Sequence, residues 1–289
     1  MLQNYLSLIK FSHTIFALPF ALVGFFLGVI QKGEGRIPFD LLAYVILAMV
    51  FARSAAMAFN RYADRKIDKA NPRTAQREIA AGIIKPHNAL IFILINVGLF
   101  VFTSWLINPL CFSLSPIALL VVLGYSYTKR FTSLSHYVLG IGLGLAPVGA
   151  YLAVTGEFGL IPILYGFVVF TWVAGFDIIY SLQDERFDKT LKLHSIPTFL
   201  GSKNALLLST VTHLITAILM IYAVYLSVNQ LPQIGWLTWI GALVFIGSLI
   251  YQHLIVKSDD LSRVNMAFFT TNGIASVVFG LLFVFDYFL

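Results

Sequence analysis

The sequence predicts an all-α integral membrane protein, a bundle of nine transmembrane helices that forms a single domain over residues 1–289. Hydrophobic residues make up 59% of the chain and charged residues 11%, against about 45–50% and 25% in an average soluble domain. A mean hydropathy of +0.87 requires repeated apolar segments of about 20 residues, each long enough to cross the roughly 30 Å hydrocarbon layer as a helix. The composition therefore excludes a soluble globular protein.

Nine apolar stretches follow one another along the chain. They cover residues 11–30, 38–59, 89–107, 110–127, 137–154, 159–182, 205–228, 234–256 and 264–289. Each stretch is continuous rather than alternating, which predicts membrane helices and not barrel strands. Only Asn108 and Pro109 separate the third stretch from the fourth, and this pair predicts a tight turn. The first stretch has no small-residue cleavage site behind it and is interpreted as a retained helix.

Positive charge is distributed unevenly between the two sides that nine spans define. When the loops are placed alternately, all but three of the 19 lysine and arginine residues fall on the first side. Lys32 and Arg36 fall on the other side, and Arg53 lies inside a span. The positive-inside rule places the first side in the cytoplasm and the C-terminus outside. The net charge of +6 is thus attributed to topology, and no nucleic-acid partner is expected.

Several function classes are excluded by missing motifs. Cys111 is the single cysteine, so neither a disulfide framework nor a multi-cysteine metal site exists, and we interpret this residue as a buried apolar side chain. The sequence contains no Gly-x-x-x-x-Gly-Lys loop, no paired His-x-x-x-His and no Gly-x-Ser-x-Gly element. Nucleotide, zinc-dependent and serine-dependent hydrolysis are therefore excluded.

Two loops on the cytoplasmic side carry carboxylates at the same spacing, each directly after a span. Asp64 and Asp68 are four residues apart, as are Asp184 and Asp188. If the helices continue past the membrane surface, each pair shares one helical face with roughly 6 Å of rise between its members. Each pair is then able to face a common cation.

Polar residues continue both patterns into the membrane. They are Arg53 and Asn60 before Asp64, and Asp177 and Ser181 before Asp184. Arg53 or Asp177 would cost at least about 2.5 kcal/mol if exposed to lipid, so both are expected to face the bundle interior and find partners there. The two polar faces are expected to look at each other across a cavity.

Four facing carboxylates repel one another unless cations lie between them. An all-oxygen ligand set suits Mg²⁺ rather than zinc or copper, and Mg²⁺ leaves positions open for phosphate oxygens. Basic residues surround the two pairs, namely Arg73, Arg77, Lys129 and Arg130. Any one of them alone is explained as a positive-inside anchor, but guanidinium groups also bind phosphate in bidentate fashion. Their joint placement predicts a site for a phosphate-bearing ligand.

At these residues the sequence resembles the UbiA superfamily of intramembrane aromatic prenyltransferases, which have nine transmembrane helices and two aspartate-rich motifs. The first motif is matched by Asn60, Asp64 and Asp68, followed by Arg73-Thr74-Ala75-Gln76-Arg77. The second is matched by the segment from Asp177 through Tyr180 and Asp184 to Asp188. Between them, the family's tyrosine-to-lysine-arginine segment is matched by Tyr125, Lys129 and Arg130, and Val138-Leu139-Gly140 extends the similarity.

The resemblance implies transfer of a polyprenyl chain from its diphosphate to an aromatic carboxylic acid, with release of diphosphate, in the bacterial inner (plasma) membrane. It further implies that Mg²⁺ is held, partly through the diphosphate, by Asp64, Asp68, Asp184 and Asp188. These four residues and Asp177 are the implied catalytic residues. Substrate binding is implied for Arg53, Asn60, Arg73, Arg77, Tyr125, Lys129 and Arg130. Arg53 is expected to bind the acceptor's carboxylate, and the alternative is that Arg53 forms a structural pair with Asp177.

Two positions depart from the family motif. Arg61 replaces the acidic residue of the usual Asn-Asp pair, and Glu78-Ile79 follows Arg77 where Pro-Leu is common. Neither change removes a carboxylate of the two pairs. They suggest a side branch of the group that acts on hydroxybenzoate, similar to enzymes of an alternative menaquinone route. The resemblance therefore implies 4-hydroxybenzoate or a related hydroxynaphthoate as the acceptor, in ubiquinone or menaquinone biosynthesis.

Two other functions are alternatives to this interpretation. A secondary transporter of an organic anion would also place charges between spans, but transport does not require two matched carboxylate pairs at one rim. A phospholipid-type alcohol phosphotransferase also uses Mg²⁺ in a helical bundle, but its Asp-Gly-x-x-Ala-Arg core is missing from this sequence.

Overall fold

The computed structural model describes residues 2–9, 17–33 and 36–289 of the chain. Within these ranges the regular structure is entirely helical. The α-helices are α1 (Leu2–Leu8), α2 (Leu18–Lys32), α3 (Phe39–Ala63), α4 (Arg65–Ala70), α5 (Pro86–Ile107), α6 (Pro109–Thr128), α7 (Ser135–Thr155), α8 (Leu160–Ser181), α9 (Glu185–Thr190), α10 (Ile196–Gln230), α11 (Trp236–Ile255) and α12 (Asn272–Phe288). A 3₁₀ turn (Leu182–Asp184) joins α8 to α9, and a π-helical segment (Met266–Thr271) leads into α12.

The helices confirm the predicted all-α membrane fold. Eight helical segments of the described chain are long and apolar enough to cross a membrane, and each coincides with one of the eight stretches expected from residue 38 onward. The remaining stretch corresponds to α2, a shorter apolar helix of 15 described residues. The expected start of that span, residues 11–16, lies outside the described residues.

Helix ends lie where the local sequence favours them. α2 and α7 each end at a glycine in the left-handed region, Gly33 with φ of 67° and Gly156 with φ of 72°, the conformation that glycine adopts without a Cβ clash. At the predicted turn between α5 and α6, the Asn108 Oδ1 accepts a hydrogen bond from the Cys111 backbone N–H at 2.8 Å. The Asn108 Nδ2 donates to the Leu152 carbonyl at 2.9 Å, which ties this turn to the end of α7.

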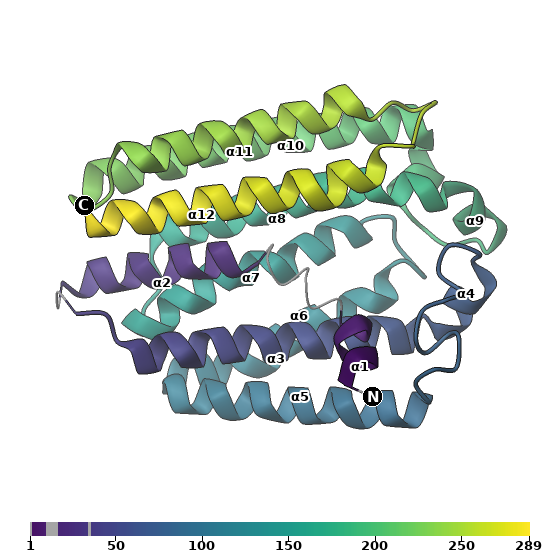
Figure 1. The fold of residues 1–289 in the computed structure, drawn as a ribbon, viewed down its shortest axis with the longest axis horizontal. Coiled ribbons are helices and arrows are strands. Elements are labelled where there is room, and N and C mark those ends of the chain that lie inside the picture. Colours follow the sequence, from purple (N-terminus) through teal and green to yellow (C-terminus); the bar gives the residue numbers. More distant parts are fainter. Residues whose placement is uncertain (1, 10–16, 34–35) are drawn as a thin grey trace.

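The helices form two halves that share α2 and α7 (Figure 1). In this view α8, α10, α11 and α12 lie above the shared pair, and α3, α5 and α6 lie below it. The contacts agree, since α7 packs on α8, α2 packs on α7, and α3 packs on α5. The short helices α4 and α9, which follow the two acidic motifs, lie together at one end of the bundle, while the C-terminus lies at the other end.

The half formed by α8, α10, α11 and α12 against α2 and α7 is filled by aromatic side chains, and we call it the packed half. Phe20, Trp172, Phe245 and Phe279 are all fully buried. The ring centroids of Phe20 and Trp172 lie 5.6 Å apart, and those of Phe20 and Phe279 lie 5.5 Å apart. The Trp172 indole N–H donates to the Asn272 Oδ1 at 2.9 Å, so the indole nitrogen inside the aromatic core has a hydrogen-bond partner.

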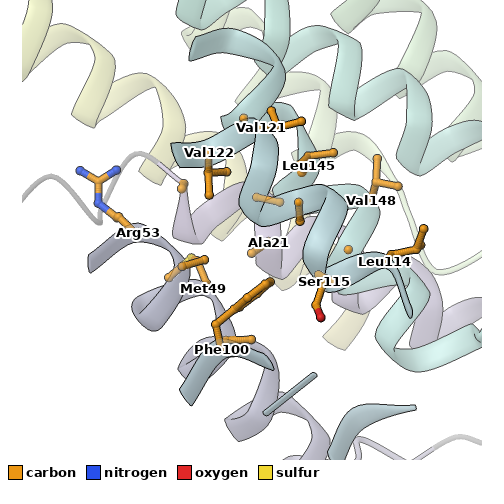
Figure 2. A pocket seen from close by; sticks show the side chains of 18 of the residues that line it. Ala21, Met49, Arg53, Phe100, Leu114, Ser115, Val121, Val122, Leu145 and Val148 are labelled. Carbon is orange, nitrogen blue, oxygen red and sulfur yellow. The ribbon is translucent and has the colours of Figure 1, made fainter. Parts of the chain in front are cut away.

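The half formed by α3, α5 and α6 against α2 and α7 is different, and we call it the hollow half. It contains a cavity of about 400 Å³ whose wall is made mainly of apolar side chains from α3, α6 and α7. Figure 2 shows side chains of these helices around the space, with Met49 from α3, Phe100 from α5, Val121 from α6 and Val148 from α7.

Candidate active site

Both long helices that lead to the acidic motifs end at those motifs. α3 ends at Ala63, and Asp64 links it to α4, whose first turn carries Asp68. α8 ends before the 3₁₀ turn that contains Asp184, and Asp188 follows in α9. The two helices therefore do not continue without interruption past the membrane surface, as the sequence analysis supposed. The chain bends at both motifs and turns the charged segments across the end of the bundle, where cations from other loops meet them.

Asp64 is the most buried carboxylate of the cluster, at 2% exposure. Its Oδ2 lies 2.7 Å from the Lys129 Nζ, and its Oδ1 lies 3.0 Å from the Arg130 Nη2. The Asn60 Nδ2 donates to the Asp64 Oδ2 at 3.4 Å. Asn60, Lys129 and Arg130, which the sequence analysis assigned to the same site, therefore all contact the Asp64 carboxylate.

Only one of the two carboxylate oxygens of Asp68 has a hydrogen-bond partner among the described residues. Its Oδ1 accepts a hydrogen bond from the Arg77 Nη1 at 2.7 Å, but its Oδ2 is buried and has no hydrogen-bond partner among the described residues. Burial raises the pKa of Asp68 above its usual range, and the nearby Arg77 guanidinium opposes that shift. A buried carboxylate oxygen without a donor is costly unless a ligand completes its environment.

Asp184 receives its partners from the loop that follows the first motif. The Arg73 guanidinium binds both carboxylate oxygens of Asp184, with an Nε–Oδ1 distance of 2.9 Å, and the Asn71 Nδ2 donates to Oδ1 at 3.0 Å. The Arg73 Nη1 also donates to the Tyr180 hydroxyl at 2.9 Å. Burial disfavours the charged form of Arg73, yet the hydrogen bonds and charge of Asp184 raise the pKa of Arg73 above its usual value.

These contacts join the two motifs into one cluster. Asp188 lies within electrostatic range of Asp184, Lys129 and His136, and Lys129 is also the partner of Asp64. The backbone carbonyl of Lys129 accepts a hydrogen bond from the backbone N–H of His194 at 2.8 Å, which fixes the loop after α6 against the loop after α9. The structure therefore brings all four paired aspartates and their four expected basic partners to the same end of the bundle.

The donor set is compatible with a hard cation. Over the described ranges, no three side chains from His, Cys, Asp and Glu are grouped closely enough to hold a metal ion, because basic side chains neutralise the carboxylates instead. The unpartnered Asp68 Oδ2 is an available ligand of the oxygen type that Mg²⁺ prefers. The residues thus fit Mg²⁺ provided that the arriving ligand draws some of the basic side chains to itself.

Asp177 has a different partner from the one considered from sequence. Its Oδ2 lies 2.7 Å from the Nδ1 of His136 at the start of α7, so it is not paired with Arg53. The His136 Nε2 accepts a hydrogen bond from the Ile196 backbone N–H at 3.4 Å. The close packing of α7 on α8 places this histidine against Asp177.

Arg53 lies at the edge of the cavity (Figure 2), apart from the apolar side chains of the wall. Its Nε is buried and has no hydrogen-bond partner among the described residues. Tyr125 also lines the cavity and lies within electrostatic range of Arg53, Asp64 and Asp177. From Tyr125 the cavity runs along α6 as far as Cys111, which lines its wall and is only partly buried.

Sequence reasoning missed three residues of the site. Asn71 binds Asp184, Tyr180 binds Arg73, and His136 binds Asp177. The available signals were an Asn-Pro pair directly after the first motif, a tyrosine inside the second motif, and a lone histidine at the start of an apolar span. None of these signals identifies a partner, because each partner is more than 40 residues away in the chain.

A cluster of carboxylates and cations at one end of a helical membrane bundle that also contains an apolar cavity is typical of a membrane protein that binds a ligand with a charged head and an apolar tail. The comparison with protein families gives the particular group. A model of the UbiA prenyltransferase family matches residues 17–274, and the chain belongs to this family.

Similar proteins and structures agree with this assignment. The 4-hydroxybenzoate octaprenyltransferase of Aliivibrio salmonicida is 27% identical over 246 residues, with 85% of this chain and 84% of that protein covered. The apo structure of a UbiA homolog from Aeropyrum pernix K1 is 31% identical and has a TM-score of 0.83, with 95% of this chain and 98% of that chain covered. A UbiA homolog from Archaeoglobus fulgidus, bound to DMAPP and Mg²⁺, has the same fold, with 19% identity, a TM-score of 0.76 and 99% of each chain covered.

Proposed function

We propose that this prenyltransferase moves a polyprenyl chain from its diphosphate to an aromatic carboxylic acid, as one membrane domain acting in ubiquinone or menaquinone biosynthesis. The observation that carries this proposal is that Arg53 and Tyr125 line one apolar cavity, and that Tyr125 also lies within electrostatic range of Asp64 in the charged cluster. The cluster suits a diphosphate, the cavity suits an isoprenoid tail, and the arginine suits a carboxylate.

The diphosphate end of the site is assigned to the two motifs. Asp64, Asp68, Asp184 and Asp188 would hold Mg²⁺, which supplies charge neutralisation to the departing diphosphate when bound. The phosphate oxygens would draw on the cations that now neutralise these carboxylates, namely Arg73, Arg77, Lys129 and Arg130. Asn60 holds Asp64 in position through its amide. The UbiA homolog from Archaeoglobus fulgidus, whose structures contain DMAPP and Mg²⁺ or GPP and Mg²⁺, supports this assignment.

The acceptor end is assigned to Arg53, Tyr125 and Asp177. The Arg53 guanidinium would bind the acceptor's carboxylate through two parallel hydrogen bonds and so fix which ring carbon meets the prenyl carbon. A new C–C bond then replaces the C–O bond to diphosphate, and the electron pair of the broken bond leaves with the diphosphate. The ring carbon must also lose its proton. Asp177, which lies near Tyr125 and is hydrogen-bonded to His136, would accept it.

The acceptor is proposed to be 4-hydroxybenzoate or a related hydroxynaphthoate. The names of the similar octaprenyltransferases support the first, and the departures at Arg61 and Glu78 favour the second. The decisive measurement uses purified protein in detergent with Mg²⁺, a polyprenyl diphosphate and each acid in turn, with products identified by mass spectrometry. We expect a prenylated acid with one of the two acceptors. Uptake of the acid into vesicles without a prenyl donor, and no product with either acid, would contradict the proposal.

We further propose that the acidic motifs face the cytoplasm of a bacterial inner membrane and that the C-terminus lies outside. The uneven distribution of positive charge supports this orientation, and α4 and α9 lie at the end of the bundle opposite the C-terminus (Figure 1). Reporter cysteines at Lys69 and Lys189, in a Cys111→Ala background, should resist a membrane-impermeant reagent in intact cells. Labelling of either position from outside would contradict the orientation.

A further inference from the structure

Arg61 is a buried arginine whose guanidinium is incompletely satisfied. It lies in the last turn of α3 and is only 8% exposed. Its Nε is buried without a hydrogen-bond partner, and across the described ranges the side chain forms no ion pair within 4 Å. The charged groups that act on it are Arg77, Asp68 and Glu78, together with the Tyr125 phenol. A buried cation in this state is strongly unfavourable unless a ligand completes its hydrogen bonds.

The unsatisfied acceptor of the cluster lies near this unsatisfied donor. Asp68 follows Arg61 by seven residues, a spacing that places both on nearly the same helical face, about 20° apart. The Asp68 backbone N–H still donates to the Asp64 carbonyl at 2.8 Å, so the helical register survives the bend. Arg77 holds the other oxygen of Asp68 and leaves Oδ2 unpaired. One donor and one acceptor without partners, within electrostatic range of each other, indicate a ligand that carries both an anion and a cation.

Glu78 explains how the charge of Arg61 is tolerated when no ligand is bound. This carboxylate is also buried, at 9% exposure, and it accepts a hydrogen bond from the Ser7 hydroxyl at 2.5 Å. It acts on Arg61 electrostatically but does not lie within ion-pair distance of it in the described structure. Glu78 therefore offsets the charge of Arg61 and leaves the guanidinium Nε without a hydrogen-bond partner among the described residues. The two departures from the family motif, at positions 61 and 78, then form one compensated change.

We propose that Arg61 binds a phosphate oxygen of the prenyl diphosphate, beside the cation-binding oxygen of Asp68. A guanidinium at this position supplies permanent positive charge to the diphosphate where the family motif places a carboxylate, and its planar fork matches the geometry of phosphate. This role rests on the proposed function, because it requires a diphosphate in the charged cluster. It adds a substrate-binding residue that the motif itself does not contain.

The test is direct binding of inorganic pyrophosphate in the presence of Mg²⁺, measured by isothermal titration calorimetry on the purified protein in detergent. Arg61→Gln should weaken the affinity for pyrophosphate roughly tenfold or more, because a charge-assisted hydrogen bond is lost. Arg65→Gln is the matched control and should bind like the wild type. The Arg65 guanidinium donates to the Tyr62 carbonyl at 2.6 Å and stacks on the Tyr62 ring, outside the ion pairs of the cluster.

A second pair of variants separates substrate binding from a structural role. Glu78→Gln alone should retain the affinity for pyrophosphate, because Glu78 only offsets charge. The double variant Arg61→Gln/Glu78→Gln removes both buried charges, so it should fold even where the single variant does not, and it should show the same loss of affinity. Pyrophosphate affinity equal to that of the wild type in either Arg61 variant would overturn the proposal.

Two further outcomes are informative. A loss of affinity for 4-hydroxybenzoate with unchanged affinity for pyrophosphate would overturn the proposal by assigning Arg61 to the acceptor. A wild-type protein that does not bind pyrophosphate at all would contradict the proposed function and, with it, the role of Arg61. Normal binding by the wild type and by the Arg61 variants would contradict only the role of Arg61.

Discussion

The packed half and the hollow half are built from helices of similar hydrophobicity and share two of them, yet their interiors are opposite. Trp172, Phe245 and Phe279 fill the space in the packed half. In the hollow half the corresponding wall carries small side chains such as Ala118, Ala146 and Gly149, and a cavity remains. Because lipid is as apolar as a leucine side chain, membrane helices associate mainly through close packing. The packed half therefore supplies stability, and the hollow half is free to leave room for a ligand.

The polar groups differ between the halves in the same way. Among the described residues of the packed half, the one buried side-chain atom without a partner is a neutral amide oxygen, that of Gln252. Among the described residues, the buried charged groups with unpartnered atoms belong to α3, in the hollow half, and to α4, which follows it. They are Arg53 and Arg61 in α3 and Asp68 in α4. Unpaired neutral atoms are tolerated in a scaffold, but unpaired charges mark the places where a ligand is expected.

The largest expected effect is the loss of turnover on removing one carboxylate of the charged cluster that the two acidic motifs form. Asp64→Asn and Asp184→Asn should each lower turnover about a thousandfold or more, because an amide keeps the size but not the charge of a hard anionic ligand. Product formation is measured in excess Mg²⁺, and size-exclusion chromatography checks that the variants remain folded. Excess chelator should have the same effect on the wild type. Full activity in chelator or in either variant would contradict the metal-dependent mechanism.

The packed half should respond in stability instead. Trp172→Ala should lower the free energy of unfolding by about 3–5 kcal/mol, because it opens a void inside a close-packed aromatic cluster and removes the indole donor of Asn272. Phe100→Ala is the comparison in the hollow half, and it should cost less because that ring already borders empty space. Both values come from thermal or denaturant unfolding in detergent. Equal costs would mean that the two halves do not differ in their contribution to stability.

Arg53→Lys tests the acceptor end of the hollow half. Because a point charge does not reproduce the two parallel hydrogen bonds of a guanidinium, we expect the KM for the aromatic acid to rise about tenfold. The KM for the prenyl diphosphate should change little, since the diphosphate is bound at the other end of the site. A similar rise for both substrates, or the same loss with an acceptor that lacks the carboxylate, would instead indicate a structural role.

The smallest expected effect concerns the length of the prenyl chain. Gly149 and Gly98 both have open space where a Cβ would be added, but only Gly149 lies in the cavity wall. Gly149→Leu should therefore slow long prenyl donors several-fold relative to short ones, because it narrows the space for the tail. Gly98→Leu adds the same volume on an exposed surface and should leave the preference unchanged. Competition between two donors of different length gives the ratio of their rates directly. Identical ratios in the two variants would mean that the cavity does not determine the preferred prenyl chain length.

The fold was predictable because its main determinant is local. An apolar stretch of membrane length forms a helix wherever it occurs, so the eight stretches from residue 38 onward match eight spans. The turn at Asn108 was also predictable, since proline begins a helix readily and asparagine caps one. In both cases the residues that determine the local structure lie within that structure or a few positions from it.

The members of the charged cluster were predictable from the sequence, but their pairings were not. The charge pattern predicted that Asp64, Asp68, Asp184, Asp188 and the basic residues lie near one another, and the ion pairs agree for three of these aspartates. Helical spacing, however, predicts only which face of a helix a residue occupies. The partner of Asp184 is Arg73, 111 residues away, and the partner of Asp177 is His136, 41 residues away. The bends at the two motifs were missed for a related reason, since a charged segment is compatible with a continuous helix until tertiary partners draw it aside.

The outer wall of the cavity determines how binding to this protein must be expressed. Ile117 lies on α6, a helix long and apolar enough to span the membrane, and it lines the cavity although it is 61% exposed. The cavity wall at Ile117 is therefore also part of the surface that faces the bilayer. Acyl chains of the surrounding lipid have the same chemistry as an isoprenoid tail and compete with it for this space. The relevant measure of a prenyl donor is consequently its mole fraction in the membrane or micelle rather than its molarity. Adding detergent at constant donor molarity lowers the mole fraction of the donor in the micelles and should weaken its apparent affinity. The apparent affinity for the water-soluble acid should not change.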